Sequence, residues 1–306
     1  MRGFLGLTKR NLLIFFKDKQ TVVFSLLTSI IVLVLYLLFL KGSFVDSING
    51  SLSSYEGLSL LISQEEVDMF ANLFLLTGIL GSAMITVSYN CLTTLVKDKE
   101  KKVDYDILAT PVRRGKIILS YFTAAALSSI ILTGIILAIG LLVISTQGNI
   151  YMSVGDILGA FGVVALGSVS ATALFMLVVL FFRSTSASGA FFGMLSAASG
   201  FVIGAYLPVS QFSESVQTVC NLFPASHITI VLRNNLLNGI LDHMDNLING
   251  ADNGMFVQRM KEVFTFKAKL FGNELEIPQM LLYVVAAIVV CLAVQTVIYI
   301  KNYKKR

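Results

Sequence analysis

The chain has 306 residues, of which 56% are hydrophobic and 13% charged, and its formal net charge is +5. This composition excludes an ordinary soluble globular domain and indicates an integral membrane protein. The cations lie beside apolar runs rather than in a patch interleaved with aromatic residues. They therefore favour a role in membrane topology, and we expect no nucleic-acid partner.

Residues 1–20 carry five cations ahead of the first long apolar run. A helical projection places Phe4 and Phe15 roughly on one side and Lys9 and Lys17 on the other. We predict an interfacial helix on the cytoplasmic leaflet, with its basic residues toward the anionic head groups of membrane lipids. A flexible positive leader is the alternative.

Six apolar stretches follow, each long enough to cross a hydrocarbon core of about 30 Å at roughly 1.5 Å per helical residue. They are residues 21–40, 70–96, 117–145, 157–182, 187–207 and 279–300. These spans hold almost no ionisable groups, whereas ion-coupled transporters place such groups at the membrane midplane. The sequence predicts an all-α integral membrane protein with six transmembrane helices in one domain, residues 1–306.

The charged loops predict the orientation of these helices. The loop 97–116 alone holds seven cations. Together with the N-terminus, Arg183 and the C-terminal tail, it carries 17 of the 23 Lys and Arg residues but only five of the 18 Asp and Glu residues. Because cationic loops are retained inside, both termini are predicted to be cytoplasmic in a multi-pass protein of the plasma membrane.

The loop 97–116 also contains a short apolar pattern. Val103, Ile107 and Leu108 lie at helical spacing, and Pro111 follows. This pattern predicts a small cytoplasmic helix with an apolar edge, ended by proline. A docking helix is one interpretation, and a solvated basic turn that only sets the orientation is the other.

The longest outer segment is predicted at residues 208–278, and residues 41–68 form a second, polar outer loop. Semi-apolar helical patterns lie on both sides of Pro224 and end at Gly239. Each is too short to cross the bilayer, so we expect a pair of re-entrant or capping helices. The rest of the segment is polar, with a turn at residues 249–254 and a short amphipathic helix at about 255–266.

Several kinds of chemistry are not supported by the sequence. The only Gly-Lys pair, at Gly115, lacks the other residues of a P-loop. His227 and His243 have no ligand partners at metal-binding spacing, and the three cysteines are isolated. We therefore predict no catalytic residue, metal or cofactor in this chain, and no enzyme activity of its own.

Two stretches carry a family resemblance. The loop contains Glu100, Ile107, Leu108, Pro111 and Arg114, and the outer segment contains Pro208, Phe223, Pro224 and Arg233. With the amphipathic start and the six spans, they make the chain resemble the ABC-2 type permeases of ATP-binding-cassette exporters over nearly all its length. The chain departs from the family at Phe223, where Asn is more usual, and at Lys102, Val103 and Tyr105, which replace Gly, Thr and Glu.

The resemblance implies one half of an ATP-driven exporter. A second copy of the chain or a homologous permease would complete the pathway, and two copies of a separate P-loop nucleotide-binding subunit would hold ATP and Mg²⁺. The loop 97–116 would be the coupling helix that rests in a cleft of that subunit. Its contact residues would be Glu100, Val103, Tyr105, Ile107, Leu108, Pro111 and Arg114.

The absence of Trp and the content of Met and Phe favour an amphipathic substrate, such as a drug, a peptide or a lipid-like molecule, over a lipid-linked glycan. The second and fifth spans combine small residues with aromatic residues and Met, so they are candidates for a dimer seam and a substrate cavity, with lipid-facing positions as the alternative. The residues chosen are Phe74, Met84, Asn90, Phe191, Phe192 and Met194.

Two other functions remain open at this point. A secondary transporter would need an intramembrane charge or a broken helix with half-site symmetry, and neither is visible. An ATP-independent membrane sensor or immunity protein would bind its ligand through the outer segment. Presence of an associated ATPase distinguishes the exporter from both.

Overall fold

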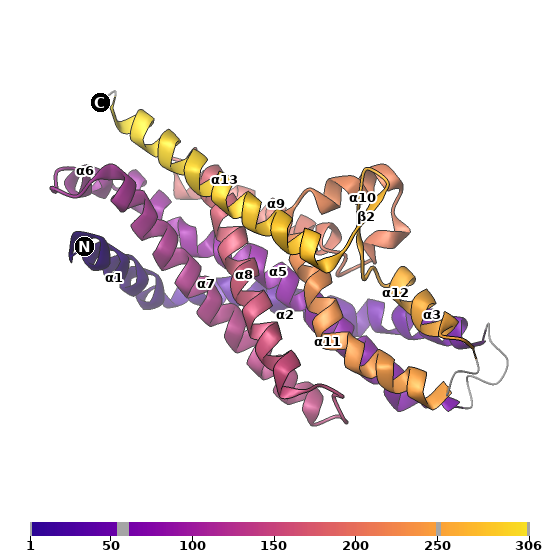
Figure 1. Ribbon diagram of the computed structural model, residues 1–306. Helices are drawn as coiled ribbons and strands as arrows, with labels where there is room; N and C mark the ends of the chain where they lie inside the picture. Colours follow the sequence, from indigo (N-terminus) through magenta and orange to yellow (C-terminus); the bar gives the residue numbers. More distant parts are fainter. Residues whose placement is uncertain (1, 54–60, 249–251, 305–306) are drawn as a thin grey trace.

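The structure is a computed structural model that describes residues 2–53, 61–248 and 252–304. Long helices lie side by side, and both ends of the chain are found with the short helix α6 at one end of the molecule, whereas α3 and α12 lie toward the other (Figure 1). The first half contains α1 (Arg2–Lys17), α2 (Lys19–Leu35), the π-helical η1 (Tyr36–Leu40), α3 (Lys41–Ser53), α5 (Gln64–Glu100), α6 (Val103–Leu108) and α7 (Arg114–Ser145). The second half contains α8 (Val154–Val179), α9 (Thr185–Val202), the short 3-10 helix η2 (Val209–Gln211), α10 (Glu214–Asn221), α11 (Pro224–Ile248), α12 (Met255–Val263), strands β1 (Ala268–Leu270) and β2 (Asn273–Leu275), and α13 (Ile277–Lys304).

Helix α5 is the centre of the bundle. Its 37 residues begin at a capping box in which Ser63 and Glu66 satisfy each other's backbone and side-chain groups. Most of its side chains are buried, because α2, α7, α8, α9 and α11 all pack against it. A helix that is apolar on every side needs neighbours on every side, so α5 sets where the other helices lie.

Five helical segments are long and apolar enough to cross a membrane, judged by length and composition among the described residues. They are Lys19–Ser53, Gln64–Glu100, Arg114–Ser145, Val154–Val179 and Ile277–Lys301. They overlap five of the six predicted spans, in agreement with the predicted all-α class, although the predicted span 157–182 extends beyond Val179. Helix α9, which contains most of the predicted span 187–207, has 18 residues and is not one of the five.

The predicted polar loop 41–68 is wrong in its first part. The helix that starts at Lys19 continues through η1 and α3 to Ser53. Phe44, Ile48 and Leu52 recur every four residues on α3 and are buried in a hydrophobic cluster with residues of α5, α11 and α12. This spacing was present in the sequence and predicts a helix, but the Ser and Gly residues between them obscured it. Part of the loop, residues 54–60, lies outside the described residues.

The outer segment also differs from the prediction in detail. Helix α11 does not end at Gly239 but runs to Ile248, because Ile240, Leu241 and Met244 continue its buried face. The predicted helix near 255–266 is α12, which ends at Val263. An antiparallel hairpin, β1 with β2, follows it and was not predicted. Part of the predicted turn, residues 249–251, lies outside the described residues.

Candidate coupling region and outer sites

The predicted coupling helix is present as α6, which follows a sharp turn at the end of α5. Lys102 makes this turn in the left-handed region, with φ of 61°. The apolar edge of α6 faces the chain's own bundle: Ile107 is buried, and Val103 and Leu108 pack against the same cluster. By contrast, 49% of Tyr105 is exposed. Of the other predicted contact residues, Pro111 is exposed and Arg114 is half-buried at the start of α7.

The last four residues of α5 each contact a different part of the bundle, and we name Lys97, Asp98, Lys99 and Glu100 the α5 terminal cluster. Lys97 donates to the Asp18 carboxylate, with Nζ to Oδ2 at 2.5 Å, and to the Thr21 hydroxyl at 3.0 Å. Asp18 is the N-cap of α2 and accepts from the Thr21 backbone N–H. The Lys97 hydrogen bond lowers the pKa of the Asp18 carboxyl to about 2.

Asp98 connects α5 to helices α1 and α7. Its carboxylate accepts from both terminal nitrogens of Arg10, at 2.7 Å and 3.0 Å, and from the Tyr121 hydroxyl at 2.5 Å. The Arg10 side chain is 30% exposed and that of Asp98 is 9% exposed. The hydrogen bond to Asp98 raises the pKa of the Arg10 guanidinium. A bidentate pair between a guanidinium and a carboxylate fixes the relative orientation of the two groups as well as the distance between them. The Arg10–Asp98 pair therefore holds α1 in one orientation on the bundle.

Lys99 and Glu100 reach the turn between α8 and α9. The Lys99 ammonium donates to the backbone carbonyl of Leu180, just after α8, at 2.8 Å. The Glu100 carboxylate accepts from the Thr185 backbone N–H at 3.2 Å and from its hydroxyl at 2.7 Å. Thr185 is the first residue of α9, where a carboxylate is favoured by the exposed backbone N–H groups.

Successive residues of an α-helix point about 100° apart, so four in a row cover the full circle around its axis. The α5 terminal cluster uses all four directions, and α6 begins three residues beyond its last member. The end of α5 that leads into α6 is therefore joined by side-chain contacts to α1, to the start of α2, to α7 and to the α8–α9 turn. Of these four residues, the sequence analysis predicted a functional role only for Glu100. The other three could have been recognised because they form a run of charged residues at the end of a helix whose preceding turns are apolar on every side.

Arg233, on α11, is a second residue at which several elements of the fold meet. Its guanidinium is fully buried and donates to four backbone carbonyls, those of Ile203 at 3.0 Å, Gly204 at 2.7 Å, Phe264 at 3.2 Å and Thr265 at 3.4 Å.

The Arg233 guanidinium carbon also lies 4.6 Å from the centre of the Phe74 ring. Burial lowers the pKa of Arg233 to about 9, so the group is still protonated at neutral pH. One side chain on α11 thus joins the end of α9, the segment after α12 and the first third of α5. The sequence had marked Arg233 in the outer segment but not this role.

A family model described as ABC-2 family transporter protein matches residues 45–300. The match covers α5 to α13, including the coupling region and Arg233, and extends over most of the chain. The chain belongs to the ABC-2 transporter family. This confirms the family predicted from the sequence, and the ABC-2 chain is a membrane transport subunit rather than an enzyme. No curated protein matches the chain.

The remaining outer residues of the predicted set lie around α10 in this ABC-2 chain. Pro208 is buried before η2, Phe223 is exposed after α10, and Pro224 is buried as the first residue of α11. The α10 end is tied to α13, because the Tyr283 hydroxyl donates to the Leu222 carbonyl at 2.8 Å. His227 is fully buried near the start of α11, with Nε2 2.7 Å from the Asn221 carbonyl oxygen.

The residues predicted for the dimer seam and the substrate cavity do not lie together on one surface of the ABC-2 chain. Phe74 and Met84 are completely enclosed by this chain's own side chains, and Asn90 is also buried. Phe191 and Phe192 of α9 pack within 6 Å of the Tyr89 ring on α5, which makes an α5–α9 contact inside one chain. Only Met194 of the set is largely exposed, at 63%. Within the predicted set, only the face of α9 that carries Met194 is thus open to a second chain or to lipid; α2, α7 and α13 also expose large apolar side chains.

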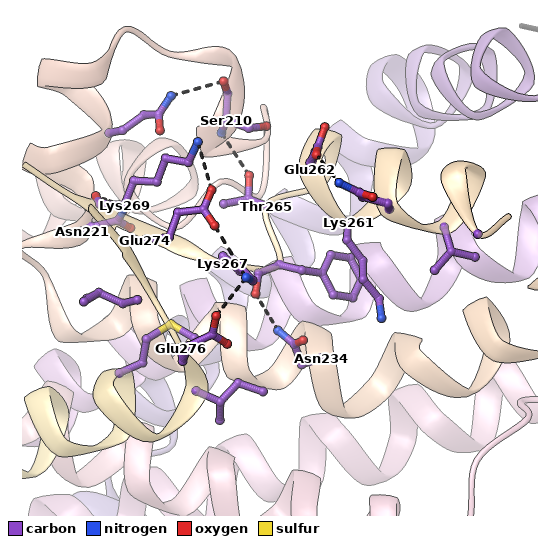
Figure 2. A pocket seen from close by; sticks show the side chains of 18 residues that line it. Ser210, Asn221, Asn234, Lys261, Glu262, Thr265, Lys267, Lys269, Glu274 and Glu276 are labelled. Atoms are coloured by element: carbon purple, nitrogen blue, oxygen red, sulfur yellow. Dashed lines mark hydrogen bonds and ion pairs between the residues drawn. The ribbon is translucent and has the colours of Figure 1, made fainter. Parts of the chain in front are cut away.

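A cavity of about 570 Å³ lies in the outer segment, enclosed by α10, α11, α12, the hairpin and the first turn of α13 (Figure 2). Figure 2 shows Lys267 between Glu274 and Glu276, with Nζ to carboxylate distances of 3.6 Å and 2.9 Å. Hydrogen bonding to Glu276 raises the pKa of Lys267. The rim is thus a network of exposed ion pairs that joins the hairpin to the start of α13.

Metal binding has no support in the part of the chain that the structure describes. Its His, Cys, Asp and Glu side chains form no group of three that could hold an ion. Cys91, Cys220 and Cys291 are all buried free thiols.

Proposed function

We propose that this chain is the permease subunit of an ATP-driven exporter that moves an amphipathic substrate outward across the plasma membrane. ATP and Mg²⁺ would bind to a separate P-loop subunit, present in two copies, and this chain would bind no cofactor. The observation that carries the proposal is the α5 terminal cluster. It connects a six-residue helix at one end of the molecule to five helices of the transport domain.

The mechanism follows from that connection. Closure of the ATP-binding subunits would move α6, and the α5 terminal cluster would carry the movement to α1, α2, α7 and the α8–α9 turn together. A nucleotide that binds one arrangement of these helices more tightly shifts the population toward it, and the substrate path opens outward. No ion relay is needed, because the energy enters through α6.

Six crossings with both termini in the cytoplasm require α9 to cross as well. The start of α9 contacts Glu100, whereas Ala205 just beyond its end packs against Gly78. These two points are 22 residues apart on α5, roughly 33 Å along the helix axis. Because α8 and α13 both run toward the α6 end, the chain must return between them, and α9 makes that return (Figure 1).

This topology can be measured with single cysteines in an otherwise cysteine-free chain. A thiol at Ser186, which is exposed before the second turn of α9, is expected to react with an impermeant reagent only after the cells are opened. A thiol at Asn273 in the hairpin is expected to react in intact cells. Equal reaction of both in intact cells would contradict a crossing by α9.

A second copy of the chain would meet the exposed face of α9. Gly189 and Gly193 have no side chain within 4 Å of the position a Cβ would take, and Met194 lies beside them. Small residues on an exposed transmembrane face allow close helix approach, which supports a dimer through this surface.

The proposal is tested with the full chain and its co-purified ATP-binding subunit in sealed vesicles, with a fluorescent amphipathic cation as the probe. ATP-dependent movement of the probe is expected. Glu100→Ala, which cuts the link to α9, is expected to reduce transport at least fivefold while ATP hydrolysis continues. Glu262→Ala, an exposed carboxylate of the outer segment, is the control and should transport normally.

Three results would count against this function. Failure to retain any ATP-hydrolysing subunit would support a sensor or immunity protein that works without ATP. Probe movement driven by an ion gradient alone would support a secondary transporter. Equal transport by Glu100→Ala and the unchanged chain would remove the coupling role of the α5 terminal cluster.

A further inference from the structure

The surface around α6 has an unusual division of side chains. Its apolar edge is turned inward, and the exposed side chains include one aromatic ring and several cations. We name this exposed set the α6 surface; it consists of Lys101, Lys102, Tyr105, Pro111, Arg113 and Lys116.

The α6 surface is cationic after its own acids are considered. Asp106 is exposed on α6, but Asp104 is buried, and the Glu100 carboxylate already accepts two hydrogen bonds from Thr185. The α6 surface therefore presents four exposed cations to a partner but only one exposed carboxylate, that of Asp106, besides Glu100. A surface with this excess of positive charge attracts a negatively charged one and repels a basic one.

The position of the α6 surface favours a protein over the lipid head groups as its partner. Helix α5 has 37 residues, a length of roughly 55 Å, whereas a bilayer with both head-group regions measures about 40–45 Å. Helix α6 follows the end of α5 at the extremity of the molecule (Figure 1). A half-exposed tyrosine at such an extremity is also typical of a residue that a protein pocket encloses.

We propose that the cleft of the ATP-binding subunit that receives α6 has an acidic rim and an apolar slot for the Tyr105 ring. This inference rests on the proposed function and adds the chemistry of the partner's surface to it. The cations of the α6 surface would guide and orient docking, and burial of the Tyr105 ring would hold the docked state. The apolar edge formed by Val103, Ile107 and Leu108 would keep α6 seated on its own bundle.

The test measures binding between the full chain in nanodiscs of neutral lipid and its separately purified ATP-binding subunit, identified by its P-loop and by ATP hydrolysis. The triple variant Lys101→Glu, Lys102→Glu, Arg113→Glu is expected to weaken binding at least tenfold at low salt. For the unchanged chain the dissociation constant should rise steeply between 50 and 300 mM salt, because exposed charges are screened over a Debye length of about 10 Å at 0.1 M.

Tyr105 is tested with a matched pair. Tyr105→Ala is expected to weaken binding about tenfold, whereas Tyr105→Phe, which keeps the ring, should bind nearly as well as the unchanged chain. The melting temperature of each variant alone shows whether α6 itself has been disturbed. Arg259→Glu, a charge reversal on the exposed side of α12 in the outer segment, is the control and should leave binding unchanged.

The possible results distinguish failure of the proposed function from failure of the proposed acidic cleft. If no ATP-hydrolysing subunit binds even at low salt, the proposed function fails. If one binds, but neither salt nor the triple reversal changes its affinity, only the acidic cleft is wrong. If the triple reversal matters solely in nanodiscs of anionic lipid, the partner of the α6 surface is the membrane and the proposal is overturned.

Discussion

Arg10 and Asp98 lie 88 residues apart in the sequence, yet two short contacts of 2.7 Å and 3.0 Å join them in the folded chain. The Tyr121 hydroxyl donates to the same carboxylate, so three helices meet at one buried charge. Helix α1, which lies outside the five candidate spans, is thereby fixed to the end of the central helix.

Removing Arg10 tests this junction. Arg10→Ala leaves the Asp98 carboxylate buried with only Tyr121 as a donor, and breaking such a pair costs about 2–3 kcal/mol when one partner is partly exposed. The expected result is a lower melting temperature in detergent. Lys9→Ala, which removes an exposed cation of the same helix, should melt like the unchanged chain. Equal melting temperatures for the two variants would mean that the Arg10 pair does not stabilise the bundle.

The pair of Asp18 and Lys97 predicts a pH dependence. The pKa of Asp18 is lowered to about 2 in the fold, so its contribution is complete above pH 4 and is lost as the pH falls through 2. Since both side chains are about one-third exposed, the contribution is at most about 1 kcal/mol.

The melting temperature of Asp18→Asn should therefore be a few degrees below that of the unchanged chain. This difference, the margin, should be the same at pH 5 and at pH 7. The margin should shrink below pH 4 and disappear near pH 2. Asp106→Asn, on the exposed side of α6, serves as the comparison and should show no margin. A margin for Asp18→Asn that grows as the pH falls would contradict the assigned pair.

Arg233 is expected to be the most sensitive position of the outer segment. Arg233→Met leaves four buried carbonyls without their donor and is expected to cost about 3–5 kcal/mol, whereas Arg233→Lys restores part of the donors and should cost less. Limited proteolysis should then cut between residues 264 and 276. Arg259→Ala, an exposed arginine on α12, should remain protected. Proteolysis at the same rate in Arg233→Met and the unchanged chain would disprove the anchoring role.

Gly239 allows the outer loop before α8 to rest directly on α11. A Cβ at this position would lie 1.8 Å from the Tyr151 carbonyl oxygen, so Gly239→Ala must displace one backbone or the other. Overpacking of this kind costs about 1–3 kcal/mol. Gly162→Ala on α8 is the matched control, because nothing lies within 4 Å of its Cβ position. Thermal unfolding of both variants should show a loss only for Gly239→Ala.

Long uncharged runs predicted helices: five of them overlap segments long and apolar enough to cross a membrane, and the sixth, 187–207, falls largely on α9, which ends at Val202 and is not one of the five. The boundaries failed where polar residues mask a helical repeat, as in α3, or where a glycine has a packing role, as at Gly239 in α11. The hairpin of β1 and β2 was missed because two strands of three residues carry too little pattern to be recognised.

The sequence by itself determined the membrane class, the family and the presence of a short helix in the cationic loop, because these depend on composition and on spacing within one segment. The tertiary structure decided which residues act together. Val103, Ile107 and Leu108 have the same spacing whether they face a partner or their own bundle, and only the packing around α6 shows that they face the bundle. The contacts of Asp98 and Arg233 depend on which distant carbonyls and charges the fold brings within 3.5 Å, and no local pattern contains that information.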